Sequence, residues 1–326
     1  MLRTPFLHPS LLAQAVTQRG VFTADQARRL GRHTADDLQW MRRRGYLVAL
    51  RRGIYALRAG FDGAEPAAQH GMRVAALGLA LTAPATLSHE SAAAELGLDL
   101  LDPDLESLHV TRPVAASSRR EAGVIHHAAD LPDHHVVRRA GLIDLTTPAR
   151  TAIDVSRETD RFECALAALD SALRMGVSAD ELLEVFTHCR SWPGARMVSG
   201  ALPIADGRAA NPGESWSRAI LIRLGLAPLQ LQVRLEDGDG LIGYVDFGWG
   251  DVVGELDGKG KYRIGVAGDP KEAVRIVRRE KLREDRIRGL GIEVARWGYA
   301  DHFRPAVIRQ RVLQAMARAA QRRRPA

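Results

Sequence analysis

The sequence predicts an α+β protein of several domains: an amino-terminal winged helix, an α+β middle scaffold and a carboxyl-terminal α/β domain. Its 326 residues exceed what one ordinary core accommodates, since domains typically hold about 100–200 residues. Charge divides the chain in the same way, because residues 1–58 carry a net +8, residues 59–205 a net −8 and residues 206–326 a net +7. We therefore expect three domains with these bounds, two basic ones flanking an acidic one.

Cysteine usage and hydropathy exclude several classes of protein. The two cysteines, Cys164 and Cys189, form no CxxC pair and have no histidine at a zinc-ligand spacing. Neither a disulfide framework nor a zinc knuckle is expected, and a reducing cytosol fits best. No apolar run approaches the roughly 18 residues of a membrane span, and residues 1–10 lack the apolar centre of a signal peptide. These observations predict a cytoplasmic protein without a membrane partner.

The first fifty residues show three short helical patterns. Apolar periodicity predicts helices over Leu11–Gln18, Ala24–Leu30 and Ala35–Arg44. Thr23 and Thr34 stand where the second and third helices need a capping side chain. Three helices in so short a segment are typical of a helix-turn-helix unit.

A basic hairpin follows the third helix. Tyr46–Ala49 and Gly53–Leu57 are short apolar runs on either side of Arg51-Arg52, the pattern of a β-wing with a charged tip. In a winged helix the third helix enters the major groove and the wing follows a phosphate backbone. The alternative is a winged helix that contacts only protein. The candidate DNA contacts are Gln39, Arg42, Arg43, Arg44, Arg51 and Arg52, of which Gln39 and Arg43 are expected to read bases.

The middle segment mixes a helix, two strands and a long helical stretch, at Ala67–Leu81, Ser107–Thr111, Gly123–His127 and 147–175. Its polar cluster (His126, His127, Asp130, Asp133, His134, His135) contains metal-binding residue types. Adjacent histidines on an extended chain point to opposite faces, which favours solvated turns over a metal site. Ser88-His89-Glu90 is likewise interpreted as structural, since sequence neighbours on a helix do not face each other.

A linker-like segment, 206–213, precedes the last domain. Periodicity beyond it predicts a helix, a three-stranded meander, a helix, a strand and a helix. This is the core order of the PD-(D/E)XK nuclease fold, also called restriction-endonuclease-like. The predicted elements are Glu214–Leu224, Leu231–Leu235, Gly243–Trp249, Asp251–Leu256, Lys271–Gly289, Ile292–Trp297 and Pro305–Arg324.

Strand register brings two acidic residues of this meander together. Gly250-Asp251 suits a two-residue hairpin turn with glycine at its first central position. Trp249 then pairs with Val252. Three residues further from the turn on each strand, Asp246 is expected to lie directly across from Glu255.

Asp257 shares that face, because it lies two residues beyond Glu255. Three carboxylates so close repel unless a cation lies between them, and oxygen ligands suit Mg²⁺ or Mn²⁺. Lys259 and Lys261 follow directly, and the chain has only four lysines among its 46 Lys and Arg residues. A lysine ammonium is compact and can orient the attacking water or neutralise a pentavalent phosphate. The alternative is that residues 257–261 form a polar turn.

Two resemblances accompany these patterns. The segment GVFTADQARRLGRHTADDLQWMRRRGYLVALRRGIYAL resembles the amino-terminal domain of AbiEi-family antitoxins of type IV toxin–antitoxin systems. LSHESAAAELGL and GLIDLTTPARTAIDVSR extend the resemblance to about residue 157. It implies a winged helix that binds the promoter of its own operon, and a nucleotidyltransferase-like toxin as the cognate partner.

The stretch NPGESWSRAILIRLGL with GYVDFGWGDVVGELDGKGKY and REKLREDRIRGLGIEVARWGY is similar to actinobacterial very-short-patch-repair-like endonuclease domains. The resemblance assigns Glu214 as first-helix acid, Asp246 as metal-binding aspartate, and Glu255 and Asp257 as an ExD pair. Lys261 stands where the family usually has histidine, and Asp257 where the ExK motif has lysine, so Lys259 or Lys261 would supply the cation from the loop. Expected phosphate contacts are Arg278, Lys281, Arg283 and Arg286.

Two functions follow from the sequence. The first is a DNA-binding protein with a Mg²⁺-dependent endonuclease-like domain that hydrolyses phosphodiester bonds of double-stranded DNA. The alternative is an AbiEi-type antitoxin and transcriptional repressor whose nuclease-like domain is not catalytic. An RNA-directed module is a third class, but the stacking aromatics of RNA readers are sparse here, with 5% aromatic residues. A homodimer is a candidate assembly, although no dimer motif is visible.

Overall fold

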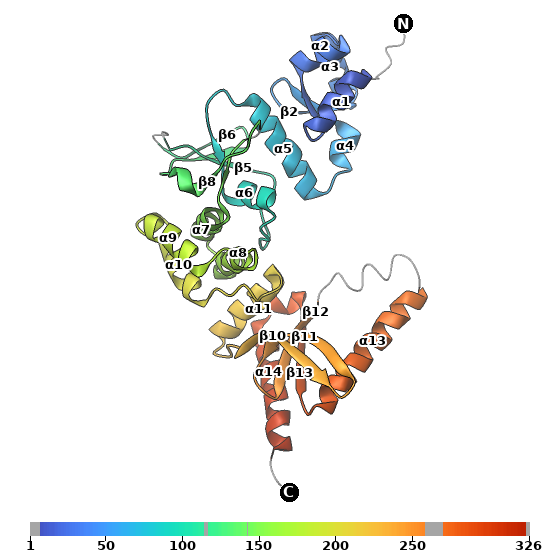
Figure 1. Ribbon diagram of the computed structural model, residues 1–326. Helices are drawn as coiled ribbons and strands as arrows, with labels where there is room; N and C mark the ends of the chain where they lie inside the picture. The colour runs from blue at the N-terminus through green and yellow to red at the C-terminus, as the bar shows by residue number, and fades with distance from the viewer. Residues whose placement is uncertain (1–6, 114–116, 142, 258–269, 324–326) are drawn as a thin grey trace. The chain divides into compact units, whose positions relative to one another are not determined.

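The computed structural model describes residues 7–113, 117–141, 143–257 and 270–323, and Figure 1 shows its ribbon. The protein is a mixed α+β chain with several sheets. Its contacts form two compact units, one of Met1–Leu98 with Asp102–Val155 and the other of Asp99–Leu101 with Ser156–Ala326. In the part of the chain that the structure describes, no helix is both long and apolar enough to cross a membrane.

The first unit begins with three helices and a small sheet of order β1-β3-β2. Predicted caps are confirmed, because Thr23 and Thr34 each form a capping box, with Gln26 and with Asp37. The first helix begins at Pro9 and not after Ser10, because the ring of His8 accepts from the Ser10 N–H. The elements are α1 (Pro9–Thr17), β1 (Val21–Thr23), α2 (Ala24–Gly31), α3 (Ala35–Arg43), β2 (Leu47–Arg51) and β3 (Ile54–Leu57).

One apolar cluster holds these helices to the hairpin. Leu38 and Met41 of α3 pack with Leu11, Phe22 and Leu47, and all are at most 3% exposed. Burial of such side chains contributes about 1.5–3 kcal/mol each and fixes which face of α3 points to solvent. Helices α4 (Arg58–Asp62) and α5 (Pro66–Ala80) follow β3.

A six-stranded sheet of order β6-β7-β5-β4-β9-β8 forms the rest of the first unit. Its short strands are β4 (Thr86–Leu87), β5 (Leu108–Thr111), β6 (Arg119–Glu121), β7 (Val124–His127), β8 (Val136–Val137) and β9 (Leu145–Thr146). Helix α6 (His89–Leu96) follows β4, a 3-10 turn covers Asp133–His135, and α7 (Pro148–Glu158) follows β9. The sheet core includes Leu87, Leu108, Val110, Val124 and Leu145.

The compact units divide the chain near residue 155, whereas the sequence places a domain boundary near residue 205. Helix α8 (Phe162–Arg174) packs on α11 (Pro212–Arg223), since Arg218 donates to both oxygens of Asp170 at 2.6 and 2.7 Å. Helices α9 (Ala179–Cys189) and α10 (Ala195–Ala201) with the 3-10 turn Leu202–Ile204 belong to the same unit. The long helical stretch expected over 147–175 is two helices, α7 and α8.

The second unit contains a four-stranded sheet of order β10-β11-β12-β13, in which β12 and β13 are parallel and the other pairs antiparallel. Its strands are β10 (Gln230–Asp237), β11 (Gly240–Gly248), β12 (Val252–Asp257) and β13 (Glu293–Gly298). Helix α13 (Pro270–Gly289) connects the parallel pair, and α14 (Pro305–Arg322) follows the 3-10 turn Tyr299–Phe303. The predicted order of these elements is the order found.

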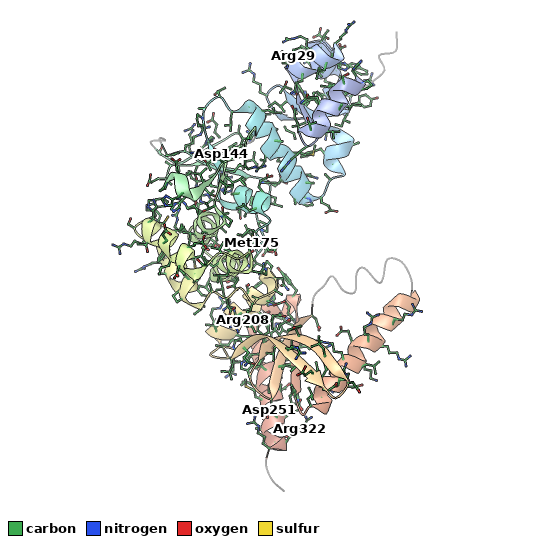
Figure 2. The ribbon with its side chains drawn as sticks, viewed as in Figure 1. Arg29, Asp144, Met175, Arg208, Asp251 and Arg322 are labelled. Atoms are coloured by element: carbon green, nitrogen blue, oxygen red, sulfur yellow. The ribbon has the colours of Figure 1, made fainter. Side chains whose placement is uncertain are left out.

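Helices cover both faces of this sheet (Figure 1). Trp216 of α11 and Ile308 of α14 share a core with Phe247 and Trp297, whereas Ile287 of α13 packs in a separate cluster with strand residues such as Val245 and Val253. Arg318 and Arg322, the latter labelled in Figure 2, hold α14 to β13 through ion pairs of 2.8 and 2.6 Å with Glu293.

Candidate functional site

The predicted register of the β11–β12 hairpin is confirmed. The Trp249 N–H donates to the Val252 carbonyl at 2.8 Å, and Phe247 pairs with Gly254. Gly250 has φ +81°, a value that glycine adopts without strain at the first central position of such a turn. The paired residues of β11 and β12 end at Phe247 and Gly254, so the predicted pairing of Asp246 with Glu255 lies one step beyond the ladder.

Beyond this point the carboxylate of Asp246, rather than a backbone carbonyl of β11, accepts a hydrogen bond from β12. Its Oδ2 accepts from the Leu256 N–H at 2.8 Å, and its Oδ1 lies 3.3 Å from Gln232 Nε2. The backbone of β12 thereby fixes one oxygen of Asp246 at the edge of the meander.

Gln232 connects Asp246 to Glu214 of α11. Its Nε2 also donates to Glu214 Oε2 at 2.9 Å, and its backbone has φ +49°, which non-glycine residues rarely adopt. No sequence pattern singled out Gln232, because alternation along a strand directs an amide between Leu231 and Val233 away from the face of those apolar residues.

Glu214 is 5% exposed near the start of α11. The Ala210 N–H and the Asn211 amide also donate to it, at 2.8 and 2.7 Å. Burial, and next the negative charge of Asp246, raise the pKa of Glu214 from 4.5 to about 7, more than these donors lower it. Near neutral pH this carboxyl can therefore hold or release a proton, as a general acid or base must.

Two arginines hold Glu255. Arg283 Nη1 lies 2.6 Å from its Oε1, and Arg296 Nη2 lies 2.7 Å from its Oε2. Burial alone lowers the pKa of Arg296, but the charges of Glu255 and Glu284 outweigh it and raise that pKa. Both oxygens of Glu255 are thus occupied by guanidinium groups, an arrangement that the sequence analysis did not anticipate.

The predicted metal ligands are less close than expected. Asp257 is exposed at the end of β12, and Lys259 and Lys261 lie outside the described residues. Among the residues that the structure describes, Asp246, Glu255 and Asp257 are not a group whose ligand oxygens all lie within 4.8 Å. A Mg²⁺ or Mn²⁺ ion held by these three would have to displace arginine from Glu255.

The predicted DNA contacts in this unit face solvent, except for Arg51 on β2. Gln39, Arg42, Arg43 and Arg44 are exposed, because Leu38 and Met41 turn the opposite side of α3 inward. Arg52 at the hairpin tip is exposed as well. Arg51 is half-buried and donates to the Ala122 carbonyl at 2.7 Å, so that its guanidinium serves the fold.

The basic helix α13 divides in a similar way. Arg278 and Lys281 are exposed, as a phosphate contact requires. Arg283 is held by Glu255, and Arg286 by both oxygens of Asp237 at 2.8 and 2.6 Å. Half of the predicted phosphate contacts on α13 are therefore engaged within the chain.

Two segments of the chain match known family models. Residues 10–58 match the family model described as transcriptional regulator, AbiEi antitoxin, and residues 83–194 match the AbiEi antitoxin C-terminal domain. Two segments of the chain are thus similar to domains of AbiEi antitoxins. Both matched ranges end before the four-stranded sheet, so the fused endonuclease domain stays a prediction.

Two relatives of part of the chain come from Mycobacterium tuberculosis. The uncharacterized proteins MT2308 and Rv2248, from two strains of Mycobacterium tuberculosis, are 38% identical over 108 residues. That match spans 33% of this chain and 40% of each relative's length. The crystal structure of RV2827C protein from Mycobacterium tuberculosis aligns at 15% identity with a TM-score of 0.40, over 71% of this chain and 93% of that one. A likeness at this level places no constraint on the fold.

Proposed function

We propose that this protein is an antitoxin-type transcriptional repressor that binds double-stranded DNA through a winged helix of residues 10–57. The matched regulator domain supports this function, and the exposed face of α3 is the observation that carries it. Gln39, Arg42 and Arg43 are three and four residues apart, so they share one side of the helix. Its buried side is fixed by Leu38 and Met41.

The chemistry of this face suits a DNA groove. Glutamine reads adenine and arginine reads guanine, each through two hydrogen bonds in the major groove, whereas Arg52 at the wing tip is placed to contact phosphate. Asp36 is exposed on the same face, three residues before Gln39. Its negative charge repels phosphate and limits non-specific binding.

The binding experiment uses DNA from the promoter of the protein's own operon and fluorescence anisotropy at several salt concentrations. Arg43→Ala is expected to weaken binding about tenfold and to relax the base preference at one position, because it removes a contact to a base. Asp36→Asn is expected to strengthen binding at low salt. Arg196→Ala removes an exposed arginine from α10 and serves as the charge-matched control. Equal affinities of wild type and Arg43→Ala would refute this mode of DNA binding.

The antitoxin role implies a second partner. The AbiEi domains favour a toxin, and a nucleotidyltransferase-like protein encoded beside this gene is the partner we propose. Co-expression tests this directly, because the repressor should restore growth to cells that produce the neighbouring protein. Continued growth arrest with soluble, folded repressor present would rule that partner out.

A PD-(D/E)XK-like hydrolase activity of the second unit is the other candidate function. The linked set Glu214, Gln232 and Asp246 favours it, because a buried carboxyl with a pKa near 7 lies beside an acid able to bind Mg²⁺ or Mn²⁺. The arginine pair on Glu255 opposes it, because a divalent ion would have to compete with two cations already in place.

Supercoiled plasmid with Mg²⁺ or Mn²⁺ separates the two functions. Nicking by wild type that is lost in both Asp246→Ala and Glu255→Ala would establish the hydrolase. If wild type does not nick the plasmid but binds the promoter, the hydrolase is excluded and only the repressor function remains. Arg283→Met adds a sharper comparison, since release of Glu255 from one arginine should strengthen Mg²⁺ binding if this carboxylate is a ligand.

A further inference from the structure

Three histidines from separate segments meet in the interior of the first unit. His89 begins α6, His109 lies on β5 and His127 ends β7. They are 3%, 6% and 6% exposed. The sequence patterns favoured structural roles for His89 and His127, and His109 was not among the predicted candidates.

Strand register explains how they meet. In the parallel β5–β7 pair, His109 lies opposite Ile125, and His127 lies two residues further on, so both histidines share one face of the sheet. The Ser88 N–H donates to the His109 carbonyl at 3.1 Å, which anchors the start of α6 beside β5. His126 points to the opposite face, where Arg112 Nε lies 3.3 Å from its Nδ1.

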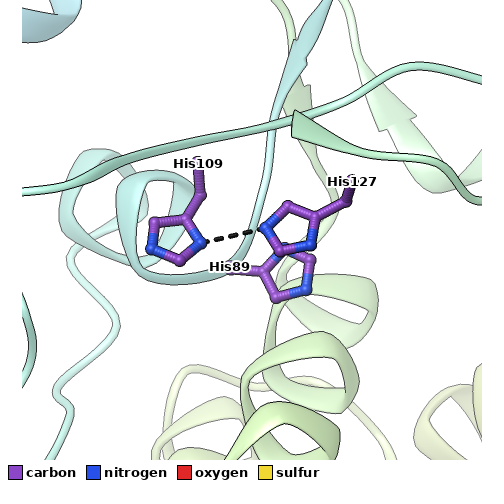
Figure 3. A group of neighbouring side chains, drawn as sticks. All are labelled: His89, His109 and His127. Carbon is purple, nitrogen blue, oxygen red and sulfur yellow. Dashed lines mark hydrogen bonds between the residues drawn. The ribbon is translucent and has the colours of Figure 1, made fainter. Parts of the chain in front are cut away.

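The rings of the three histidines lie next to one another (Figure 3). One nitrogen from each ring lies within 4.8 Å of the other two, and His109 Nδ1 lies 3.0 Å from His127 Nε2. The His89 ring stacks on the His127 ring with centroids 3.7 Å apart. Nitrogens bound to one tetrahedral zinc at about 2.0–2.1 Å are themselves about 3.3 Å apart, so modest ring rotations bring all three to an ion.

Neighbouring side chains orient two of the rings. Ser88 Oγ lies 2.9 Å from His89 Nδ1, and Glu90 Oε2 lies 3.6 Å from His109 Nε2. When Ser88 Oγ accepts the N–H of His89 Nδ1, the lone pair of His89 is on Nε2. When Glu90 accepts the N–H of His109 Nε2, the lone pair of His109 is on Nδ1, which is the atom that faces His127. Histidine ligands of metals commonly donate their other N–H to such oxygens.

The backbone at His89 is a further, independent observation. Its φ of +51° lies in the left-handed region, which residues with a side chain rarely adopt. Strained backbone of this kind gathers at functional sites. Here it turns the imidazole of the first α6 residue toward β5 and β7.

We propose that His89, His109 and His127 bind one divalent transition-metal ion of the zinc class, with Ser88 and Glu90 as positioning residues. Imidazole ligands suit zinc, copper and nickel, whereas Mg²⁺ and Ca²⁺ require oxygen. The ion joins the start of α6 to two strands of the sheet within the segment that matches the AbiEi antitoxin C-terminal domain. This site is separate from the DNA-binding face and does not depend on it.

Metal titration of the untagged, full-length protein tests the site. After chelation and dialysis, Co²⁺ is expected to give visible absorption bands that saturate at about one equivalent per chain. Added Zn²⁺ should abolish these bands and raise the temperature of thermal unfolding. A wild-type protein that shows neither saturable Co²⁺ bands nor a shift with Zn²⁺ would overturn the proposal.

Variants separate this site from metal bound elsewhere. His109→Asn and His127→Asn are expected to lose the Co²⁺ bands, whereas His126→Gln, an adjacent buried histidine on the other face, should keep them. Glu90→Gln has a side chain 24% exposed and is expected to fold; it should weaken Zn²⁺ binding about 10–100-fold. Equal Zn²⁺ affinity in Glu90→Gln and wild type, or loss of the bands in His126→Gln, would contradict the assignment even if the ligand variants fail to fold.

Discussion

Arg296 and Glu255 occupy paired positions on the adjacent parallel strands β13 and β12, and their side chains form an ion pair of 2.7 Å. With Arg283 on the other oxygen, Glu255 is a carboxylate neutralised from two sides. Glu255→Gln should therefore lower the free energy of unfolding by about 2–3 kcal/mol, because it removes the nearest counter-charge of two half-buried guanidinium groups. Urea denaturation measures the change.

Glu236→Gln is the matched control for that variant. Its partner is Arg234, and both side chains are more than half exposed. An exposed pair contributes at most about 1 kcal/mol. If both glutamine variants lose the same small amount, the arginine pair does not stabilise the sheet.

The pKa of Glu214 is expected to respond to Asp246. Burial and the charge of Asp246 together raise the pKa of Glu214 to about 7, so Asp246→Asn should lower that pKa. Carboxyl ¹³C NMR across pH 4–9 measures it, with Asp257→Asn as the exposed control. An unchanged titration in Asp246→Asn would show that the two carboxylates do not interact.

The pKa of Glu214 also determines how its contribution to the stability of the fold depends on pH. Between about pH 4.5 and 7 the folded chain holds a proton on Glu214 that the unfolded chain releases. The stability that Glu214 contributes is therefore complete below about 4.5 and is lost as the pH rises through about 7.

His302 is expected to act in the opposite direction. Burial lowers its pKa from 6.5 to about 4, and its ring stacks on Trp216 at 4.4 Å. Since the unfolded chain takes up a proton first, the contribution of His302 is complete above about pH 6.5 and is lost as the pH falls through about 4. His302→Phe keeps the stacking and should reduce the loss of stability over that interval by about 3 kcal/mol. Parallel pH profiles for wild type and variant would exclude His302 as the cause.

The contact between α8 and α11 depends on Arg218. Asp170 is fully buried and accepts from Arg218 and from Ser215 Oγ at 2.7 Å. Arg218→Met should cost about 3–5 kcal/mol, because it leaves a buried carboxylate without its cation. Arg223→Met on the same helix, whose side chain is 53% exposed and 3.7 Å from Glu163, should cost less than about 1 kcal/mol. A mild effect of Arg218→Met in chemical denaturation would mean that Asp170 is protonated in the folded chain.

Local patterns predicted much of the secondary structure. Thr23 and Thr34 cap the helices expected of them, because a cap involves side chains three residues apart. The register of Trp249 with Val252 likewise follows from a two-residue turn. The first helix began earlier than expected, because a histidine supplied the capping acceptor.

The sequence by itself determined the helices and hairpins, the placement of Asp246 and Glu255 on the two strands of one hairpin, and the resemblance to AbiEi domains, since each depends on residues close together in the chain. Only the tertiary structure decided what surrounds those carboxylates: Gln232 from β10, Arg283 from α13 and Arg296 from β13. It also brought His89, His109 and His127 together across two strand pairings. The physical reason is that pairing between distant strands is selected by burial of whole faces, which no local pattern specifies.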